Sequence, residues 1–143
     1  MDIKQLTPNF SVAPQIEPGD MAELAAKNVK TVISNRPDSE VPPSHQANAM
    51  RAAAEAQGIE FVHIPITQDS LTPESASAQL EAMQSAESSV LAFCRSGTRS
   101  TVVWAMGQAM SGGMPVDDII QAAEQAGYDL TNMRPVLSQM SGD

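Results

Sequence analysis

The sequence is poor in cysteine and in basic residues. Cys94 is the single cysteine among 143 residues, so no disulfide can form within the chain. Three lysines and five arginines stand against 17 acidic residues, which gives a net charge of −9. A surface of that sign disfavours nucleic acid and anionic membranes as partners. A lone free thiol is typical of proteins in a reducing compartment, and we therefore expect a cytoplasmic location.

Long apolar runs are also missing. No stretch approaches the ~20 apolar residues that a membrane-spanning helix needs. Residues 1–4 show neither the charged start nor the apolar core of a signal peptide, so we expect no secretion signal. Hydrophobic residues make up 42% of the chain and charged residues 17%, a balance that is typical of a globular protein. The length predicts a single domain over residues 1–143.

Short apolar stretches alternate with helical patterns along the chain. The expected strands are 6–13, 30–34, 60–65 and 89–93. Strands separated by helices predict an α/β fold with a mostly parallel central sheet flanked by helices. Ligands of such sheets bind at the carboxyl ends of the strands. Three loops leave those ends and should share one rim: 35–43, 66–72 and 94–99.

The segment around Cys94 carries the strongest chemical signal. A buried strand is expected to end at this cysteine, and a helical pattern begins a few residues later. A strand, a tight loop and a helix in this order direct backbone N–H groups and the positive end of a helix dipole at one point. Gly97 allows the loop to fold back without a Cβ atom. We predict that Cys94 is a nucleophile that this field keeps as a thiolate.

Hydroxyl and guanidinium groups surround the predicted nucleophile. The residues expected to bind an anionic substrate are Arg95, Ser96, Gly97, Thr98, Ser100 and Thr101, with Arg36 from a neighbouring loop. Arg36 could instead pair with Asp38. Asp69 is a candidate proton donor, and its alternative is a solvated loop aspartate. No metal or cofactor motif is visible, so no cofactor is expected.

Two of these patterns resemble a known fold. Cys94-x-x-Gly97, followed by hydroxyls and a helix, resembles the phosphate loop of tyrosine and dual-specificity phosphatases. The strand 61–66 with Asp69 resembles the strand and acid loop of the same enzymes. Over residues 6–128 the chain is similar to a bacterial family of phosphatase-like, beta-lactamase-hydrolase-like proteins, which are described as phosphatases or sulfurtransferases. The resemblance implies a phosphatase-like fold with Cys94 as the nucleophile.

One departure from the phosphatase pattern concerns the arginine. Phosphatases carry it six positions after the cysteine, where this chain has Ser100, whereas Arg99 comes one place early. One residue in a helical first turn is a rotation of about 100°. Arg99 is therefore not expected to aim as the phosphatase arginine does unless the loop closes one residue shorter. The order Cys-Arg-x-Gly-x-Arg resembles the active loop of rhodaneses instead.

This departure favours sulfur transfer as the activity. Cys94, assisted by Arg99, would take sulfur from a small anionic donor such as thiosulfate or a persulfide, and an external thiol would accept it. The alternative is a phosphatase that cleaves a phosphate ester with a loop adapted around Arg99. Thr101 lies at the position where phosphatases keep a hydroxyl that stabilises the leaving thiolate. A non-catalytic redox-sensing or anion-binding module is a further alternative. The sequence leaves the oligomeric state open.

Overall fold

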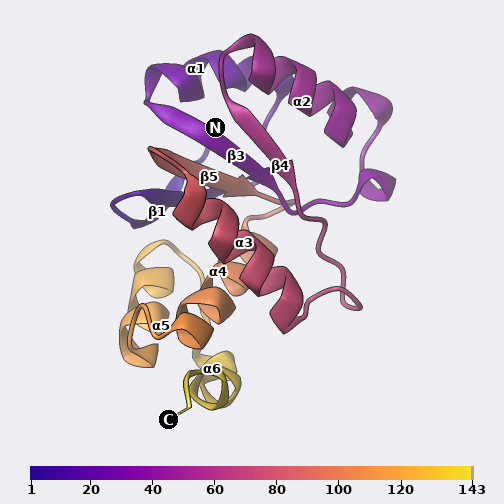
Figure 1. The fold of residues 1–143 in the computed structure, drawn as a ribbon. Coiled ribbons are helices and arrows are strands. Elements are labelled where there is room, and N and C mark those ends of the chain that lie inside the picture. Colours follow the sequence, from indigo (N-terminus) through magenta and orange to yellow (C-terminus); the bar gives the residue numbers. More distant parts are fainter. Residues whose placement is uncertain (143) are drawn as a thin grey trace.

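The computed structural model describes residues 1–142, and its helices and strands alternate through most of the chain (Figure 1). The elements are β1 (Lys4–Thr7), β2 (Phe10–Ala13), α1 (Met21–Ala26), β3 (Val29–Ser34), α2 (Ala47–Ala56), β4 (Glu60–His63), α3 (Pro73–Ser85), β5 (Ser89–Phe93), α4 (Thr98–Ser111), α5 (Val116–Gln125) and α6 (Arg134–Ser141). Four short 3-10 turns complete the described part of the chain: Pro18–Asp20, Asp38–Glu40, Pro43–His45 and Thr131–Met133.

The sheet has five strands in the order β1-β2-β5-β3-β4. The pairs β2–β5, β5–β3 and β3–β4 are parallel, whereas β1 is antiparallel to β2. This arrangement confirms the predicted α/β fold with a mostly parallel sheet. The single strand predicted over 6–13 is wrong, because the chain reverses at Pro8 and Asn9 and pairs β1 with β2 as a hairpin. A proline has no N–H group to contribute to a ladder, which is consistent with its place in the turn.

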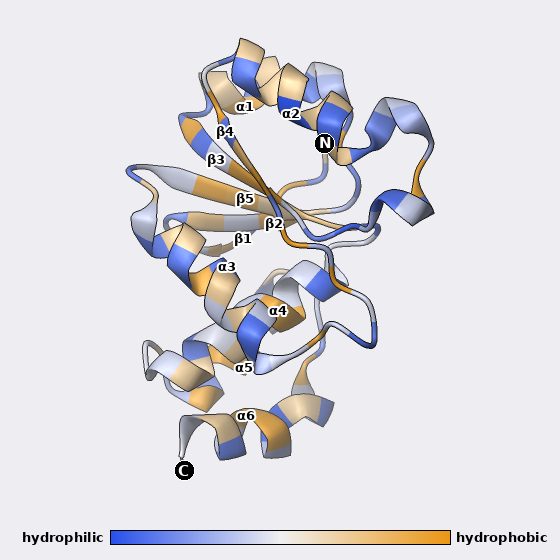
Figure 2. Cartoon of the chain, turned by 45° about the vertical axis from the view of Figure 1, so that its right-hand side comes forward, coloured by the Kyte–Doolittle hydropathy of each residue, from blue (hydrophilic) through white to orange (hydrophobic). Residues whose placement is uncertain are grey.

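Helices cover both faces of the sheet (Figure 1). Helices α1 and α2 lie on one side, and α3, α4, α5 and α6 lie on the other. Consecutive strand residues point to opposite sides, so Val32 packs toward α1 and α2 while Ile33 packs toward α4. Figure 2 shows hydrophobic residues along the central strands and hydrophilic residues on the outer helix surfaces. Trp104 of α4 is buried and stacks on Phe10.

The buried side chain of Asn35 joins the loops at the carboxyl ends of the strands. Its backbone N–H donates to Phe93 O at 2.8 Å, and its side-chain amide donates to Ile64 O at 3.0 Å and to Gln79 Oε1 at 2.8 Å. Its carbonyl accepts a bond from the N–H of Ile66 at 2.9 Å. The ends of β3 and β5 and the segment after β4 are therefore held at one rim, as the sequence predicted.

Candidate active site

Cys94 lies at this rim, immediately after β5, and no part of it is exposed to solvent. Its Sγ accepts a hydrogen bond from the backbone N–H of Gly97, with N and Sγ 3.0 Å apart. Gly97 has φ of +92°, a conformation that glycine adopts readily and other residues rarely do. The next amide, that of Thr98, donates to Ser96 Oγ instead of the sulfur. The sequence predicted several backbone N–H groups directed at the sulfur. Among the described residues, one of them, that of Gly97, donates a hydrogen bond to it.

The hydroxyl groups predicted around the sulfur divide into two pairs. Ser96 and Thr98 are exposed, and Ser96 Oγ donates to Thr98 Oγ1 at 3.0 Å. Ser100 and Thr101 are fully buried in the first turn of α4, and Thr101 Oγ1 donates to Gly97 O at 2.8 Å. In this conformation Thr101 supports the loop from inside. Substrate contact by Ser100 and Thr101 stays a prediction.

Arg99 is the second residue of α4, and its guanidinium reaches across the rim. Nη1 and Nη2 donate to the two carboxylate oxygens of Glu40 at 2.9 and 2.7 Å, and Nη1 also donates to Ile66 O at 2.8 Å. The bond with Glu40 raises the pKa of Arg99 above its usual value, and the nearby Cys94 contributes in the same direction. The guanidinium therefore lies near the sulfur. The following residue, Ser100, is fully buried. The aim of Arg99 relative to the phosphatase arginine stays a prediction.

The hydrogen-bond partners of Arg99 leave one edge of the guanidinium available. The group carries five N–H donors. Glu40 and Ile66 take three of them, all on Nη1 and Nη2. Among the described residues, the Nε–H of Arg99 has no hydrogen-bond partner, and it lies beside a second Nη2 proton. An Nε/Nη2 edge of this kind forms the bidentate fork that binds an oxyanion.

Glu40 connects Arg99 to Arg36. Arg36 Nε lies 3.3 Å from Glu40 Oε1, its Nη2 donates to Glu40 O at 3.2 Å, and its Nη1 donates to Gln15 Oε1 at 3.0 Å. Asp38, the partner that the sequence offered for Arg36, instead accepts the Ala47 N–H at the start of α2. Pairing of Arg36 with Asp38 is therefore wrong. The spacing of four residues between Arg36 and Glu40 is the signal in the sequence for this pair.

The ion pairs of Glu40 predict a pH effect on stability. Hydrogen bonding by Arg99, with a smaller contribution from Arg36, lowers the pKa of Glu40 below its usual value. The stabilisation is therefore complete above the ordinary glutamate value and is lost as pH falls through the lowered pKa. Glu40→Gln should flatten the decline of the melting temperature below about pH 4.5. The change should be modest because the side chain is 34% exposed.

Thermal unfolding of both proteins between pH 7 and pH 3 measures this effect. Glu87→Gln, in the loop before β5, serves as a matched removal of one carboxylate away from the arginines. Parallel melting curves for the wild type and Glu40→Gln across the whole acid range would contradict the assignment.

Two predicted site residues have no side-chain partner among the described residues. Arg95 is exposed, and its carbonyl accepts the N–H of Gln15 at 3.3 Å. Asp69 is exposed in the loop after β4, which Ser70 closes through bonds to Thr67 N and Pro65 O. Arg99 is bonded to the start of that loop at Ile66, so the segment lies at the rim, and the role of Asp69 as proton donor stays a prediction.

Two other side chains support the rim. His63 is the last residue of β4, and its Nε2 donates to Arg36 O at 2.9 Å. Tyr128, in the segment after α5, donates its hydroxyl to Ser96 O at 3.1 Å. Sequence reasoning gave Tyr128 no role, and the only signal was that it is the sole tyrosine of the chain.

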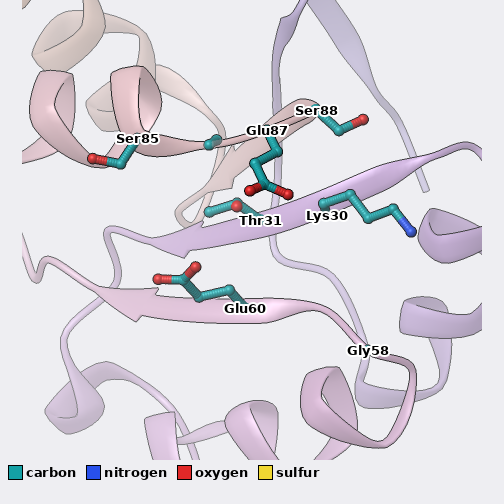
Figure 3. A pocket seen from close by; sticks show the side chains of 8 residues that line it. Lys30, Thr31, Gly58, Glu60, Ser85, Glu87 and Ser88 are labelled. Carbon is teal, nitrogen blue, oxygen red and sulfur yellow. The ribbon is translucent and has the colours of Figure 1, made fainter.

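A hollow of the described surface lies away from this rim. It has a volume of about 670 Å³ at the opposite ends of the strands and is shown in Figure 3. Its lining is Lys30, Thr31, Gly58, Glu60, Ser85, Ala86, Glu87 and Ser88. Because this lining lacks a cysteine or a histidine, the hollow offers no counterpart to the nucleophile.

Residues 1–142 show neither a metal-binding cluster nor a membrane-spanning helix. That part of the chain contains no cluster of three or more histidine, cysteine, aspartate or glutamate side chains suited to a metal ion. It also contains no helix with the length and apolar character needed to cross a membrane.

Comparison with known proteins places this site in a family. Residues 2–111 match the family described as beta-lactamase hydrolase-like protein, phosphatase-like domain. The chain belongs to this family. The beta-lactamase hydrolase-like protein of Agrobacterium fabrum is 29% identical over 130 residues, which cover 91% of this chain and 30% of that protein. The chain thus spans less than a third of the length of the curated relatives that it matches.

Solved structures share the fold of this phosphatase-like domain. A protein of Neisseria meningitidis, described provisionally as a phosphatase, is 34% identical and superposes with a TM-score of 0.81 over 98% of this chain and 99% of its own. TpbA of P. aeruginosa, in complex with phosphotyrosine, is 19% identical with a TM-score of 0.60 over 96% and 90% of the two chains. These matches confirm the predicted phosphatase-like fold and the resemblance to the family. They lend no support to its sulfurtransferase aspect.

Proposed function

We propose that the protein is a cysteine-dependent phosphatase that hydrolyses a phosphate monoester. The observation that supports this proposal is the hydrogen bonding of Arg99, which lies near Cys94: Glu40 and Ile66 bind only Nη1 and Nη2, so the Nε edge has no hydrogen-bond partner among the described residues. An oxyanion-binding fork beside a nucleophilic sulfur is the arrangement that a transferring phosphoryl group requires. The match to phosphatase-like relatives supports the same chemistry.

The first step transfers the phosphoryl group to sulfur. The Cys94 thiolate attacks phosphorus, an S–P bond forms, and the P–O bond to the leaving group breaks with its electron pair on oxygen. That oxygen takes a proton from an acid, for which Asp69 is the candidate on the neighbouring loop. Arg99, near the sulfur, and the Gly97 amide, bonded to it, would stabilise the negative charge of the phosphoryl oxygens.

The second step returns the enzyme to its starting state. Water attacks phosphorus, the S–P bond breaks with its electron pair on sulfur, and inorganic phosphate leaves. The carboxylate that donated the first proton accepts one from the attacking water. Because Cys94 is fully buried in this structure, the loop around it has to move before a substrate reaches the sulfur.

Sulfur transfer is the second candidate, and the place of Arg99 five positions after the cysteine favours it. In that reaction Cys94 attacks the outer sulfur of thiosulfate, an S–S bond forms and sulfite leaves with the electron pair. An external thiolate then takes the outer sulfur from the Cys94 persulfide and restores the Cys94 thiolate. No step needs a proton on the leaving sulfite.

Two assays on the same protein separate the candidates. For a phosphatase, we expect steady hydrolysis of para-nitrophenyl phosphate that Cys94→Ser abolishes, and an unchanged mass after incubation with thiosulfate without reductant. A gain of one sulfur atom on Cys94, with no hydrolysis of the phosphate ester, would reject the phosphatase and support sulfur transfer. Failure of both reactions in the folded protein would leave the non-catalytic module as the function.

A further inference from the structure

Tyr128 brings a polar group to the Cys94 loop from a distant part of the chain. It follows α5 and lies beyond residue 111, where the family match ends. Its ring packs at the margin of the core that includes Trp104, and its hydroxyl donates to Ser96 O at 3.1 Å. The side chain is partly exposed, so it lies between the core and the surface of the loop.

The hydrogen bonds of Tyr128 and of Cys94 meet at one peptide unit. The carbonyl of Ser96 and the N–H of Gly97 belong to the same planar group and point in opposite directions. Tyr128 Oη donates to the carbonyl end, and the N–H end donates to Cys94 Sγ at 3.0 Å. A Cβ atom on Gly97 would lie 2.1 Å from Tyr128 Oη. Only glycine at position 97 therefore allows the tyrosine to come this close to the peptide.

We propose that Tyr128 is a positioning residue that holds the Ser96–Gly97 peptide with its N–H toward Cys94 and thereby stabilises the thiolate. The inference rests on Cys94 being the nucleophile of the proposed function. Tyr128 does not touch the sulfur or, in this arrangement, the reacting phosphorus, and it acts through the peptide.

The physical reason lies in the freedom of glycine. Gly97 can adopt positive and negative φ at little cost, so the preceding peptide can rotate unless a contact fixes it. A rotated peptide would turn the carbonyl oxygen of Ser96 toward the sulfur, and the negative end of that dipole would oppose a thiolate. The Tyr128 hydroxyl holds the carbonyl on the outer side. Donation to the carbonyl also polarises the peptide and strengthens its N–H as a donor.

The electrostatic surroundings keep Tyr128 a donor. Burial and the nearby Cys94 raise the pKa of Tyr128, and Asp2 contributes in the same direction, so the phenol stays protonated where the enzyme works. The charged groups that face the tyrosine and the sulfur are Asp2 near the N-terminus and Arg99 of α4, with Glu40 behind Arg99. Tyr128→Phe leaves all three charges in place, so it isolates the hydroxyl.

The test follows the pH dependence of the Cys94 thiolate in Tyr128→Phe. Because Cys94 is the single cysteine, both the ultraviolet absorbance of the thiolate and its alkylation by iodoacetamide report this residue alone. Loss of one hydrogen bond changes an equilibrium constant about fivefold. We therefore expect the midpoint of the Cys94 thiolate titration to rise by about half a pH unit or more. The kcat for para-nitrophenyl phosphate below that midpoint should fall about fivefold.

Controls separate this role from packing. Asp129→Asn alters the adjacent residue, whose carboxylate binds Thr131, and it should leave the midpoint unchanged. Tyr128→Leu removes the ring as well and should raise the midpoint at least as much as Tyr128→Phe. An unchanged midpoint in a folded Tyr128→Phe or Tyr128→Leu protein would overturn the inference. A raised midpoint in a protein that hydrolyses no phosphate ester would uphold the inference and reject the proposed phosphatase.

Discussion

Arg99→Lys is expected to lower kcat/KM for para-nitrophenyl phosphate by about 100-fold to 1,000-fold, the usual effect of removing one oxyanion donor. Three hydrogen bonds to Glu40 and Ile66 anchor one edge of the guanidinium and leave the Nε edge to fork onto phosphoryl oxygens. A lysine ammonium is a point charge and cannot form that fork. Steady-state kinetics of the purified variants measure the loss.

Arg134→Lys provides the matched control for this substitution. Arg134 is half-exposed on α6, where it pairs with Asp117, and the same change there should leave kcat/KM within about twofold because surface pairs contribute little. Thermal unfolding of both variants shows whether the fold is intact. If Arg99→Lys retains wild-type kcat/KM in a folded protein, Arg99 does not bind the phosphoryl group, and Arg95 becomes the remaining arginine of the loop to test.

Gly97→Ala should cause the second large loss of kcat/KM. Gly97 has φ of +92°, and an added Cβ would lie 2.1 Å from Tyr128 Oη and 2.9 Å from its Cζ. The backbone strain costs about 1–3 kcal/mol, and the contact with the tyrosine ring adds to it. Displacement of the loop should also move the amide away from Cys94. We expect a lower melting temperature and at least a 100-fold loss of kcat/KM, as for a lost oxyanion donor.

Gly112→Ala separates the effect of backbone strain from the effect of the contact with Tyr128. Gly112 also has positive φ, of +70°, but nothing lies within 4 Å of the Cβ that alanine would add. This variant should lose stability with little change in kcat/KM. Combining Gly97→Ala with Tyr128→Ala relieves the contact and should restore part of the stability. Equal effects of Gly97→Ala and Gly112→Ala on activity would show that the close approach of Tyr128 to the loop is unimportant.

The parts of the fold that depend on local order could be predicted from the sequence. Strand and helix patterns alternate along the chain, and this is enough to place the ends of β3, β4 and β5 at one rim. The order of a buried strand, Cys94, Gly97 and a helix is likewise local, so the position of the nucleophile followed from the sequence. The β1–β2 hairpin did not, because the turn at Pro8 and Asn9 lacks a glycine and the apolar pattern runs on through it.

The contacts that complete the site are long-range, and their partners could not be read from the sequence. Glu40 meets Arg99 across 59 residues, and Tyr128 meets Ser96 across 32. The residue types show that Glu40 and Tyr128 can form hydrogen bonds. Their partners, however, depend on which loops the folded chain brings together. The rotation argument for Arg99 compared its position with the loop length of a phosphatase, and it gave no sign of the contact with Glu40. Here Gly97 turns the chain immediately before α4 begins at Thr98.

The single tryptophan gives the protein a built-in optical probe. Trp104 is 1% exposed and stacks on Phe10, with ring centroids 6.3 Å apart, so its indole links the helix that begins at the Cys94 loop to the N-terminal hairpin. Its fluorescence should be that of an indole shielded from water and should shift to the red on unfolding. An anion that repositions the first turn of α4 would therefore change the emission of Trp104 without touching it. Anion binding could then be titrated by fluorescence, with no chromogenic substrate.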